Sequence, residues 1–429
     1  MGGRAVLLVV MGFSMAFLVI GNNFNRMSLS AMDNMTYYAS RQVSHSICVT
    51  GSNIACNKFY LNPAWTGAYT NVPCQGGTFS CTVTNIDTVK LIKSVTTIST
   101  YSGYYTGYSS IVYHDTIIVF FQPGRFSRYS YYSVSEGATT IYWVTGDTVK
   151  GPFHTEDNLN VNGNPYFYGY VTIKGNLVKA NGSSDHPTFA SGYITGYTLP
   201  INGSGVSNVQ TFAQTNGKVF SGHDTVYLTF ANSNLSYRYT WNAKDTTKAL
   251  STLAPNGDIF VQNGTIRLKG TVQGQYTVGC SGTSTTVGGS VYLDSDIVYK
   301  TNPVTSPSST DILGIVAQNN VWVTNNTANS NSININASMY CQNGSFGAQN
   351  YNTGSNRGYI NIIGGIIQNV RGAVGTTSGG HIVTGYNKNY SYDTRFMFSA
   401  PPNFPNTGAY NVISWYESGL NSATDRNLY

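Results

Sequence analysis

The first fifty residues have the pattern of one continuous helix with two unlike halves. Residues 5–20 read AVLLVVMGFSMAFLVI, without a charge and almost wholly apolar. Residues 22–50 are more polar, yet neither Pro nor Gly interrupts them. Apolar side chains recur in this half at helical spacing, at Phe24, Met27, Ala31, Met35, Tyr38 and Val43. A helix over residues 3–50 would be roughly 70 Å long. Such a rod suits a subunit whose apolar tip lies in a membrane or a fibre core, while its base packs on a globular part.

Three interpretations of this start compete. A secretory signal peptide needs a basic start and an early small-residue cleavage site, but only Arg4 is basic and Ser28-Leu29-Ser30 lies too far along. A lone transmembrane anchor usually needs about 20 apolar residues, and residues 5–20 are fewer and include Gly12 and Ser14. We favour a filament-forming helix that lies in the membrane before assembly and in the filament core afterwards. The residues expected to make the assembly contacts are Leu7, Leu8, Val9, Val10, Phe13, Phe17 and Leu18.

The composition predicts a rigid, mainly β protein outside the cell. Charged residues are 9% of the 429 residues, against about 25% in ordinary soluble proteins. Uncharged polar residues, 46 Gly and 33 Tyr replace them, and the abundance of aromatic and β-branched residues argues against disorder. The net charge of +6 is spread without a dense basic run, so we expect no nucleic-acid partner.

Six cysteines are an even number, which suits an oxidising compartment and disulfide bonds, and reduced, buried thiols are the alternative. No CxxC motif occurs, so redox and zinc-ribbon sites are not expected. The residues between the third and fourth cysteines, QGGTFS, suggest a closed hairpin, and the first two could fix the end of the helix. Fifteen pairings are possible. The simplest joins cysteines that are neighbours in the sequence, which gives Cys48 with Cys56, Cys74 with Cys81, and Cys280 with Cys341.

Three regions are expected along the chain. Residues 1–57 form the long helix, and residues 58–150 form a loop-rich antiparallel β region whose first part, 58–85, reads as linker. Residues 151–429 show short apolar triplets between Gly and Asn, followed by longer runs that start roughly twenty to twenty-six residues apart from Ile312 onward. This pattern is typical of a β-solenoid of the right-handed parallel β-helix kind with a C-terminal tail. A stack of β-sandwiches is the alternative, and an outer-membrane barrel fits less well because the triplets are too short.

Catalysis needs ionisable groups that converge, and this chain has few. His154 and Glu156 would share one face of a strand, with Asp157 on the other, so a metal site or an acid-base pair is possible there. We favour a turn in which Asp157 or Asn158 caps backbone amides. The pairs His114-Asp115 and His223-Asp224 precede apolar strands, and we interpret them as polar residues at strand edges.

Polysaccharide lyases and hydrolases that use the solenoid fold carry carboxylates on one face. The candidates here are Asp258, Asp294, Asp296 and Asp311. Asp294 and Asp296 are two residues apart, so they could hold a cation or flank a sugar, but solvated surface is the simpler interpretation. We therefore expect no enzyme activity, no metal and no cofactor.

Asp-Thr followed by an apolar residue occurs four times, at Thr88, Thr116, Thr148 and Thr225. The pattern resembles the O-glycosylation sequence of Bacteroidota, so these threonines are glycan candidates. The alternative is that Asp-Thr simply begins strands.

Two regions resemble known families. GGRAVLLVVMGFSMAFLVIGNNFNRMSLSAMDN resembles the helix of type IV pilin-like proteins of the minor, PilX-like kind, although residue 5 is Ala where pilins usually carry Glu. GPFHTEDNLNVNGNPYFYGYVT, GGIIQNVRGAVGT and FPNTGAYNVISWYE resemble an uncharacterised surface domain family of Bacteroidota and relatives, which supplies no catalytic residues. The first resemblance implies an extracellular, cell-surface appendage built as a helical homo-polymer.

Two functions follow as expectations. The first is a non-enzymatic structural subunit of a pilus-like filament, assembled through the apolar helix and able to act as an adhesin. The second is a membrane-anchored monomer whose β-solenoid binds or cleaves a surface glycan, since Tyr-rich surfaces stack well on sugar rings.

Overall fold

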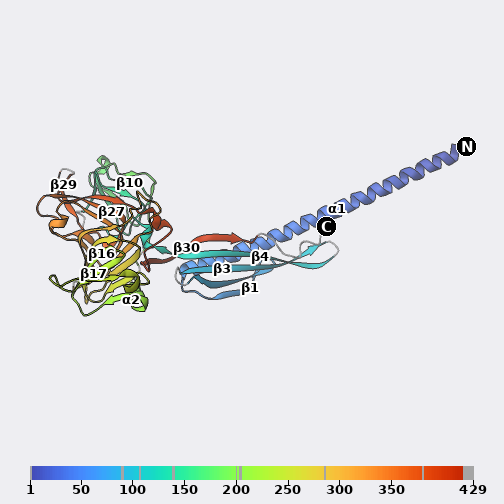
Figure 1. The fold of residues 1–429 in the computed structure, drawn as a ribbon. Coiled ribbons are helices and arrows are strands. Elements are labelled where there is room, and N and C mark those ends of the chain that lie inside the picture. Colours follow the sequence, from blue (N-terminus) through green and yellow to red (C-terminus); the bar gives the residue numbers. More distant parts are fainter. Residues whose placement is uncertain are drawn as a thin grey trace. The chain divides into compact units, whose positions relative to one another are not determined.

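The computed structural model describes residues 2–87, 91–105, 108–137, 141–199, 201, 205–284, 287–378 and 381–418. Over these residues the protein is mainly β with one long helix, α1 (Gly2–Leu61) (Figure 1). The chain divides into two compact units. The first unit comprises Met1–Pro123 with Gly408–Tyr429, and the second comprises Gly124–Thr407. These boundaries differ from the expected divisions after residues 57 and 150.

Helix α1 continues eleven residues beyond Thr50, where the sequence pattern suggested that it stops. Gly51 does not end the helix because it is buried against the sheet of its own unit, where a Cβ atom would meet the Phe79 ring at 2.6 Å. Packing therefore outweighs the low helix propensity of glycine. The helix ends before Asn62 and Pro63, where proline disfavours the helical conformation of the residue that precedes it.

The first unit holds a five-stranded sheet in the order β1-β2-β3-β4-β30. Its strands are β1 (Ala68–Cys74), β2 (Gly77–Asp87), β3 (Ile92–Tyr105), β4 (Tyr108–Arg125) and β30 (Asn406–Glu417). The pairs from β1 to β4 are antiparallel. The expectation of a linker over 58–85 is wrong, because β1 and β2 form a hairpin there. Gln75 and Gly76 make the reversal, both with positive φ, as two-residue hairpin turns require.

Strand β30 comes from the end of the described chain and joins the sheet beside β4. The backbone amide of Ser418 donates to the carbonyl of Thr116 at 3.0 Å. The segment expected as a C-terminal tail of the solenoid is therefore an edge strand of the first unit. In sequence, the whole second unit is an insertion between β4 and β30.

Only the last third of α1 packs on this sheet. Its buried residues recur at steps of one, three and four and are mostly small: Ser40, Ser44, Ile47, Cys48, Gly51, Ser52, Ala55 and Phe59. The apolar ones among them form one core with Phe79, Val95, Ile117 and Phe121 on the facing strands. Small residues let the helix lie close to the strands, so the seam depends on close packing rather than on bulk.

The second unit consists mostly of short strands. In chain order these are β5 (Tyr131–Ser135), β6 (Trp143–Val144), β7 (Thr148–Lys150), β8 (Phe153–Thr155), β9 (Leu159–Asn162), β10 (Tyr166–Phe167), β11 (Val171–Ile173), β12 (Leu177–Lys179), β13 (Thr188–Phe189), β14 (Tyr193–Thr195), β15 (Lys218–Phe220), β16 (Thr225–Asn232), β17 (Asn234–Arg238), β18 (Thr246–Ala249), β19 (Asp258–Val261), β20 (Thr265–Val272), β21 (Gln275–Cys280), β22 (Val291–Tyr299), β23 (Ile312–Ala317), β24 (Val321–Val323), β25 (Ile333–Cys341), β26 (Phe346–Ala348), β27 (Asn356–Val370), β28 (Gly375–Ser378) and β29 (His381–Ser391). Short helices include α2 (Gly205–Asn216) and α3 (Leu250–Leu253).

Most of these strands pair in parallel with a strand two or more places along the chain. One ladder runs β15-β19-β21-β23-β25-β27 and another runs β16-β20-β22-β24-β26. In β16 the side chains of Val226, Leu228 and Phe230 are buried while the alternate residues face outward. The buried positions of successive strands form one large apolar core.

Candidate functional site

The apolar part of α1 is exposed along its length in the structure. The side chains of Leu8, Phe17 and Leu18 are 71%, 71% and 74% exposed. All seven residues predicted to make the assembly contacts are exposed by 57% or more. The helix is long and apolar enough to cross a membrane by length and composition. Figure 1 shows this part of α1 extending beyond the sheet of its unit.

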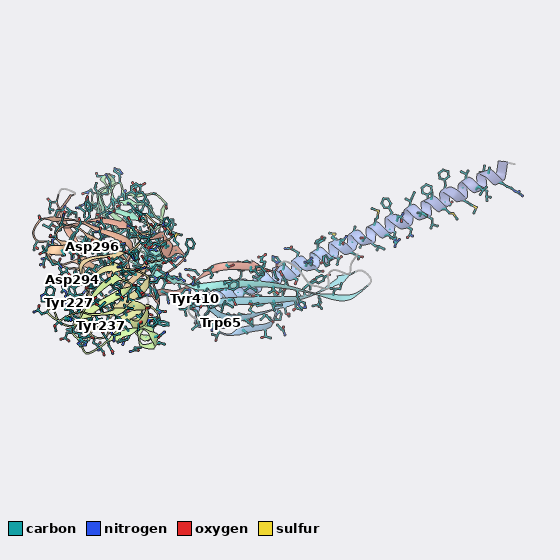
Figure 2. The ribbon with its side chains drawn as sticks, in the orientation of Figure 1. Trp65, Tyr227, Tyr237, Asp294, Asp296 and Tyr410 are labelled. Atoms are coloured by element: carbon teal, nitrogen blue, oxygen red, sulfur yellow. The ribbon has the colours of Figure 1, made fainter. Side chains whose placement is uncertain are left out.

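The exposed surface continues into the second half of the helix. Phe24, Met27, Met35 and Tyr38 were expected on an amphipathic face, and they are 74%, 72%, 76% and 67% exposed. Side chains project on all sides of this stretch in Figure 2. Residues of the helix become buried from Ser40 onward. The uncovered apolar surface is therefore longer than the sixteen-residue segment. Single exposed apolar residues are common on protein surfaces, whereas a continuous run of them marks an interaction site.

The six cysteines are free thiols in the structure, and the simplest predicted pairings do not fit its geometry. Cys48 and Cys56 lie on one helix, about 12 Å apart along its axis. Ala317 pairs with Cys280 on one side and Cys341 on the other. Those two cysteines are therefore separated by two strand spacings, about 9.6 Å, which exceeds the reach of a disulfide.

The hairpin cysteines are also out of register. Cys74 pairs with Gly77, whereas Cys81 pairs with Tyr69 five residues earlier on β1. That offset is roughly 17 Å along the strand. The Sγ of Cys81 instead donates to the carbonyl of Gly51 at 3.6 Å, so this thiol belongs to the core beneath the helix.

The glycan candidates stand at half-buried strand positions. Thr148 begins β7 and Thr225 begins β16, while Thr116 lies within β4, and all three are only partly exposed. Thr88 lies outside the described residues. Two of the three described threonines thus begin strands, and glycosylation at these positions stays a prediction.

His154 and Glu156 are brought together as their spacing predicts. The Nε2 of His154 lies 3.0 Å from Oε1 of Glu156, and its Nδ1 lies 2.8 Å from the Thr172 hydroxyl. Lys174 reaches the same carboxylate at 3.0 Å. Burial lowers the pKa of His154, although Glu156 opposes the effect. His154 is fully buried and the Glu156 side chain is 4% exposed, whereas the Lys174 side chain is 51% exposed and reaches the pair from the surface.

Asp157 faces away from this pair and caps backbone amides. Its carboxylate accepts from the amide of Glu136 at 3.1 Å and from the amide of Asn158 at 2.7 Å. The carbonyl oxygen of the Asn158 side chain in turn accepts from the amide of Asn176 at 2.8 Å. The sequence predicted this turn, and both candidate residues perform the capping.

The carboxylates proposed for a sugar site do not converge. Asp294 forms a bidentate ion pair with Arg267, at 2.8 Å and 2.5 Å. Asp296 accepts from the backbone amide and the side chain of Asn334. Asp311 binds the amides of the loops at Gly274 and Thr301. Each of these three acids is held by its own partners, and the described residues contain no cluster suited to a metal ion.

Asp258 is different, because its carboxyl group is fully buried and only one of its two oxygens accepts a hydrogen bond from a described residue. The side-chain amide of Asn403 donates to Oδ2 at 2.6 Å. The other oxygen, Oδ1, has no hydrogen-bond partner among the residues that the structure describes. Burial raises the pKa of this carboxyl to about 7, and the hydrogen bond from Asn403 partly opposes the rise.

The histidines of the two His-Asp pairs contact residues other than the adjacent aspartate. Asp115 is buried in β4 and bonds Nδ1 of His45 on the helix at 2.6 Å, whereas the neighbouring His114 bonds Thr100 and the carbonyl of Ser99. No spacing in the sequence signals a partner seventy residues away. His223 stacks flat on Tyr239 with the ring centres 3.6 Å apart.

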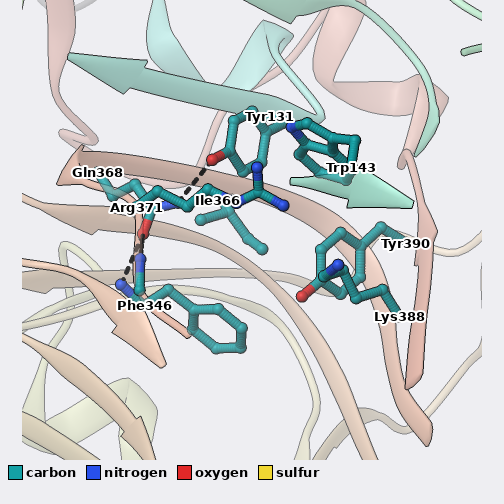
Figure 3. Close-up of a pocket in the computed structure, with 9 residues that line it drawn as sticks. Tyr131, Trp143, Phe346, Ile366, Gln368, Arg371, Lys388 and Tyr390 are labelled. Atoms are coloured by element: carbon teal, nitrogen blue, oxygen red, sulfur yellow. Dashed lines mark hydrogen bonds between the residues drawn. The ribbon is translucent and has the colours of Figure 1, made fainter. Parts of the chain in front are cut away.

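A buried polar network stabilises the second unit around Glu136. This carboxylate accepts from Tyr131, Ser133 and the Trp143 indole, and Arg371 forms an ion pair with it at 2.8 Å. A small pocket of about 10 Å³ lies beside the network (Figure 3). That volume admits about one water molecule, so the pocket is too small for an organic ligand.

Comparisons with known proteins do not establish the function of this chain. No family model and no curated protein matches the chain, so the resemblance to a domain family of Bacteroidota is unsupported. Among solved structures, the chain is similar to the competence-associated pilin ComZ from Thermus thermophilus, with a TM-score of 0.35 and 11% identity over 83% of this chain and 86% of that one. A likeness this weak does not establish a shared fold or function.

Proposed function

We propose that this protein is a structural subunit of an extracellular pilus-like filament. The observation that carries the proposal is the uncovered apolar surface of α1, which runs from residue 5 to residue 20 without a charge. Copies of the same helix supply a complementary surface, so the occupant is a second copy of this chain. The membrane would hold the helix before assembly, since its length and hydropathy suit a bilayer.

The available energy suits assembly. The seven assembly residues are 57% to 74% exposed, and full burial of a large apolar side chain contributes about 1.5 to 3 kcal/mol. Burying the exposed parts of all seven would contribute roughly 7 to 14 kcal/mol per subunit. Association costs about 4 to 15 kcal/mol in lost freedom, so the apolar segment offsets much of this cost before contacts of the second half are added.

We further propose that the second unit is a β-solenoid. Parallel pairing between strands of successive turns supports it, because a sandwich would pair neighbours in antiparallel fashion. An asparagine ladder supports it as well. The side chain of Asn361 donates to Asn334 at 3.1 Å, and Asn389 donates to Asn361 at 2.8 Å, in three successive parallel strands. Asp296 ends this ladder by accepting from Asn334.

A structural rather than catalytic role is part of the proposal. Three of the four candidate acids, Asp294, Asp296 and Asp311, accept hydrogen bonds from an arginine partner or from backbone amides, and His154 is buried with its carboxylate partner. Groups so placed contribute to the rigidity of the fold, which a filament subunit needs.

Assembly from detergent tests the proposal. The full chain is purified in detergent, the detergent is removed, and the product is examined by negative-stain electron microscopy. Leu8→Asp and Val10→Asp should abolish filaments, while Val304→Asp should not. Val304 is a matched control because it is 69% exposed, against 71% for Leu8, and lies in the second unit.

Two outcomes would contradict the proposal. Normal filaments from both helix variants would show that the apolar segment is not the assembly surface. A monodisperse wild-type particle in lipid bilayers, without filaments under any condition of detergent removal, would favour the membrane-anchored monomer instead.

A further inference from the structure

A row of aromatic and cationic side chains crosses the outer face of the second unit. Tyr227 on β16 pairs with Arg267 on β20, which pairs with Tyr292 on β22, which pairs with Trp322 on β24. Arg238 on β17 extends the row on the other side of Tyr227. On β16, β20, β22 and β24 the residues flanking Tyr227, Arg267, Tyr292 and Trp322 are buried in the core, so these four face outward together. We call this row the aromatic stripe.

The stripe is an ordered stack. The Arg238 guanidinium lies 4.8 Å from the centre of the Tyr227 ring, and the Arg267 guanidinium lies 5.4 Å from the Tyr292 ring. Trp241 stands beside this end of the stripe, 6.1 Å from Tyr227 between ring centres and 68% exposed. The rings are thus held by neighbours while Trp241 remains available, which lowers the ordering cost of binding.

The charges of the stripe are neutralised within the protein. Asp294 binds Arg267 through both oxygens, and Asp245 binds Arg238 at 2.8 Å. Thr324 donates a further hydrogen bond to Asp294 at 2.8 Å. An anionic ligand would have to displace these carboxylates, so the stripe does not suit a phosphate or a nucleic acid. Its chemistry is that of flat rings flanked by hydrogen-bonding oxygens.

We propose that the aromatic stripe and Trp241 bind an uncharged linear polysaccharide. The C–H face of a sugar ring would stack on the exposed ring of Trp241. The following sugars would lie against the outward edges of the stripe, where their hydroxyls would donate to carboxylate oxygens. Adjacent strands are about 4.8 Å apart, a spacing comparable to that of successive sugar rings in an extended chain. The polysaccharide would therefore run across the strands, from Trp241 towards Trp322. Arg267 links Tyr227 to Asp294, since its guanidinium lies 6.0 Å from the centre of the Tyr227 ring and binds the Asp294 carboxylate; Figure 2 labels both residues on the second unit.

This site is independent of filament assembly, because its residues all belong to the second unit. The Leu8→Asp variant should therefore bind polysaccharide as the wild type does. Failure of the assembly proposal and failure of this one are then separate results.

Affinity electrophoresis of the full chain tests the proposal. The protein is run in a non-glycosidic detergent through native gels that contain a soluble β-glucan, a mannan, a galactan or, as a polyanion, dextran sulfate. We expect retardation by a neutral polysaccharide, with the apparent affinity reduced tenfold or more in Trp241→Ala and largely kept in Trp241→Phe. Tyr359→Ala is the matched control, since Tyr359 is 51% exposed on β27 and outside the stripe.

Three outcomes would overturn the proposal. One is the absence of retardation by all three neutral polysaccharides. Another is retardation by dextran sulfate alone, which would show a polyanion site. The last is equal retardation of the wild type, Trp241→Ala and Trp322→Ala, since the second variant removes the far end of the stripe. Trp241 is mostly exposed, so its replacement should leave the fold intact.

Discussion

Asp258 makes the stability of the second unit depend on pH in a predictable direction. Its carboxyl is buried at the start of β19, where the residue pairs with Thr277. Burial raises its pKa to about 7, against 3.8 for the ordinary group. The folded protein therefore binds this proton more tightly than the unfolded chain does. Below pH 3.8 both states are protonated, and the stability from this site is fully present.

As the pH rises above 3.8, the unfolded chain releases the proton while the folded protein still holds it. The free energy of unfolding then falls until about pH 7, beyond which both states are ionised and the loss is complete. The difference between about 7 and 3.8, at about 1.36 kcal/mol for each tenfold change in proton affinity, gives about 4 kcal/mol. A loss of this order is large beside the usual stability of a domain.

Asp258→Asn removes the titration and leaves a side chain of the same size. We expect the variant to be less sensitive to pH between 4 and 8 and to exceed the wild type in stability at pH 8. Urea unfolding in detergent, followed by tryptophan fluorescence, gives the free energies at each pH. The difference in the free energy of unfolding between wild type and variant isolates this site. Burial lowers the pKa of His154, which makes stability rise with pH, but this contribution is the same in both proteins.

Asp224→Asn is the control, because Asp224 is an exposed carboxylate of the same unit. It should keep the pH dependence of the wild type. Parallel pH profiles for the wild type and Asp258→Asn would refute the reasoning, since they would mean that the buried carboxyl is ionised as easily in the folded protein as in the unfolded chain.

Three further predictions concern stability and thiol chemistry. Glu136→Gln should lower the free energy of unfolding of the second unit by about 3 kcal/mol or more, because it leaves the buried Arg371 without its counter-charge; urea unfolding measures it, and an unchanged midpoint would contradict it. Gly51→Val should destabilise the first unit by about 1 to 3 kcal/mol, since its added carbons would overlap the Phe79 ring; limited proteolysis of the helix base against the wild type reports the effect. Cys280 and Cys341 should be recovered as free thiols by mass spectrometry under non-reducing conditions. They should react with iodoacetamide at pH 8 only after unfolding, since burial raises the pKa of the Cys341 thiol to about 12. A disulfide-linked pair of peptides that contain these two cysteines would contradict the strand register.

The sequence predicts those features that depend on local periodicity. The long helix follows from uninterrupted apolar and helical spacing, and the exposed tip follows from sixteen residues without a charge. The alternation in β16, with Val226 and Leu228 buried and Tyr227 outward, is readable from the pattern of two. The cap formed by Asp157 is readable as well, because an acid before Asn in a turn can satisfy nearby amides.

Features that depend on distant residues are not readable in this way. Glu136 and Arg371 are separated by 235 positions, and His45 meets Asp115 across 70 positions. The sequence offers no signal for either pair. The pairing of β30 with β4 is hidden for the same reason, so the last described strand reads as a tail. Neighbouring cysteines look like partners in the sequence, but strand register places Ala317 between Cys280 and Cys341.

The insertion of one unit into the other has a consequence for how the protein tolerates change. The core beneath α1 and the core of the second unit are separate apolar clusters. A destabilising substitution in one cluster therefore need not unfold the other, since compact units with their own apolar cores can unfold separately. The assembly surface, moreover, lies on a part of the helix that neither cluster covers. Variation on the outer face of the second unit would thus alter the proposed polysaccharide site without altering the proposed assembly surface.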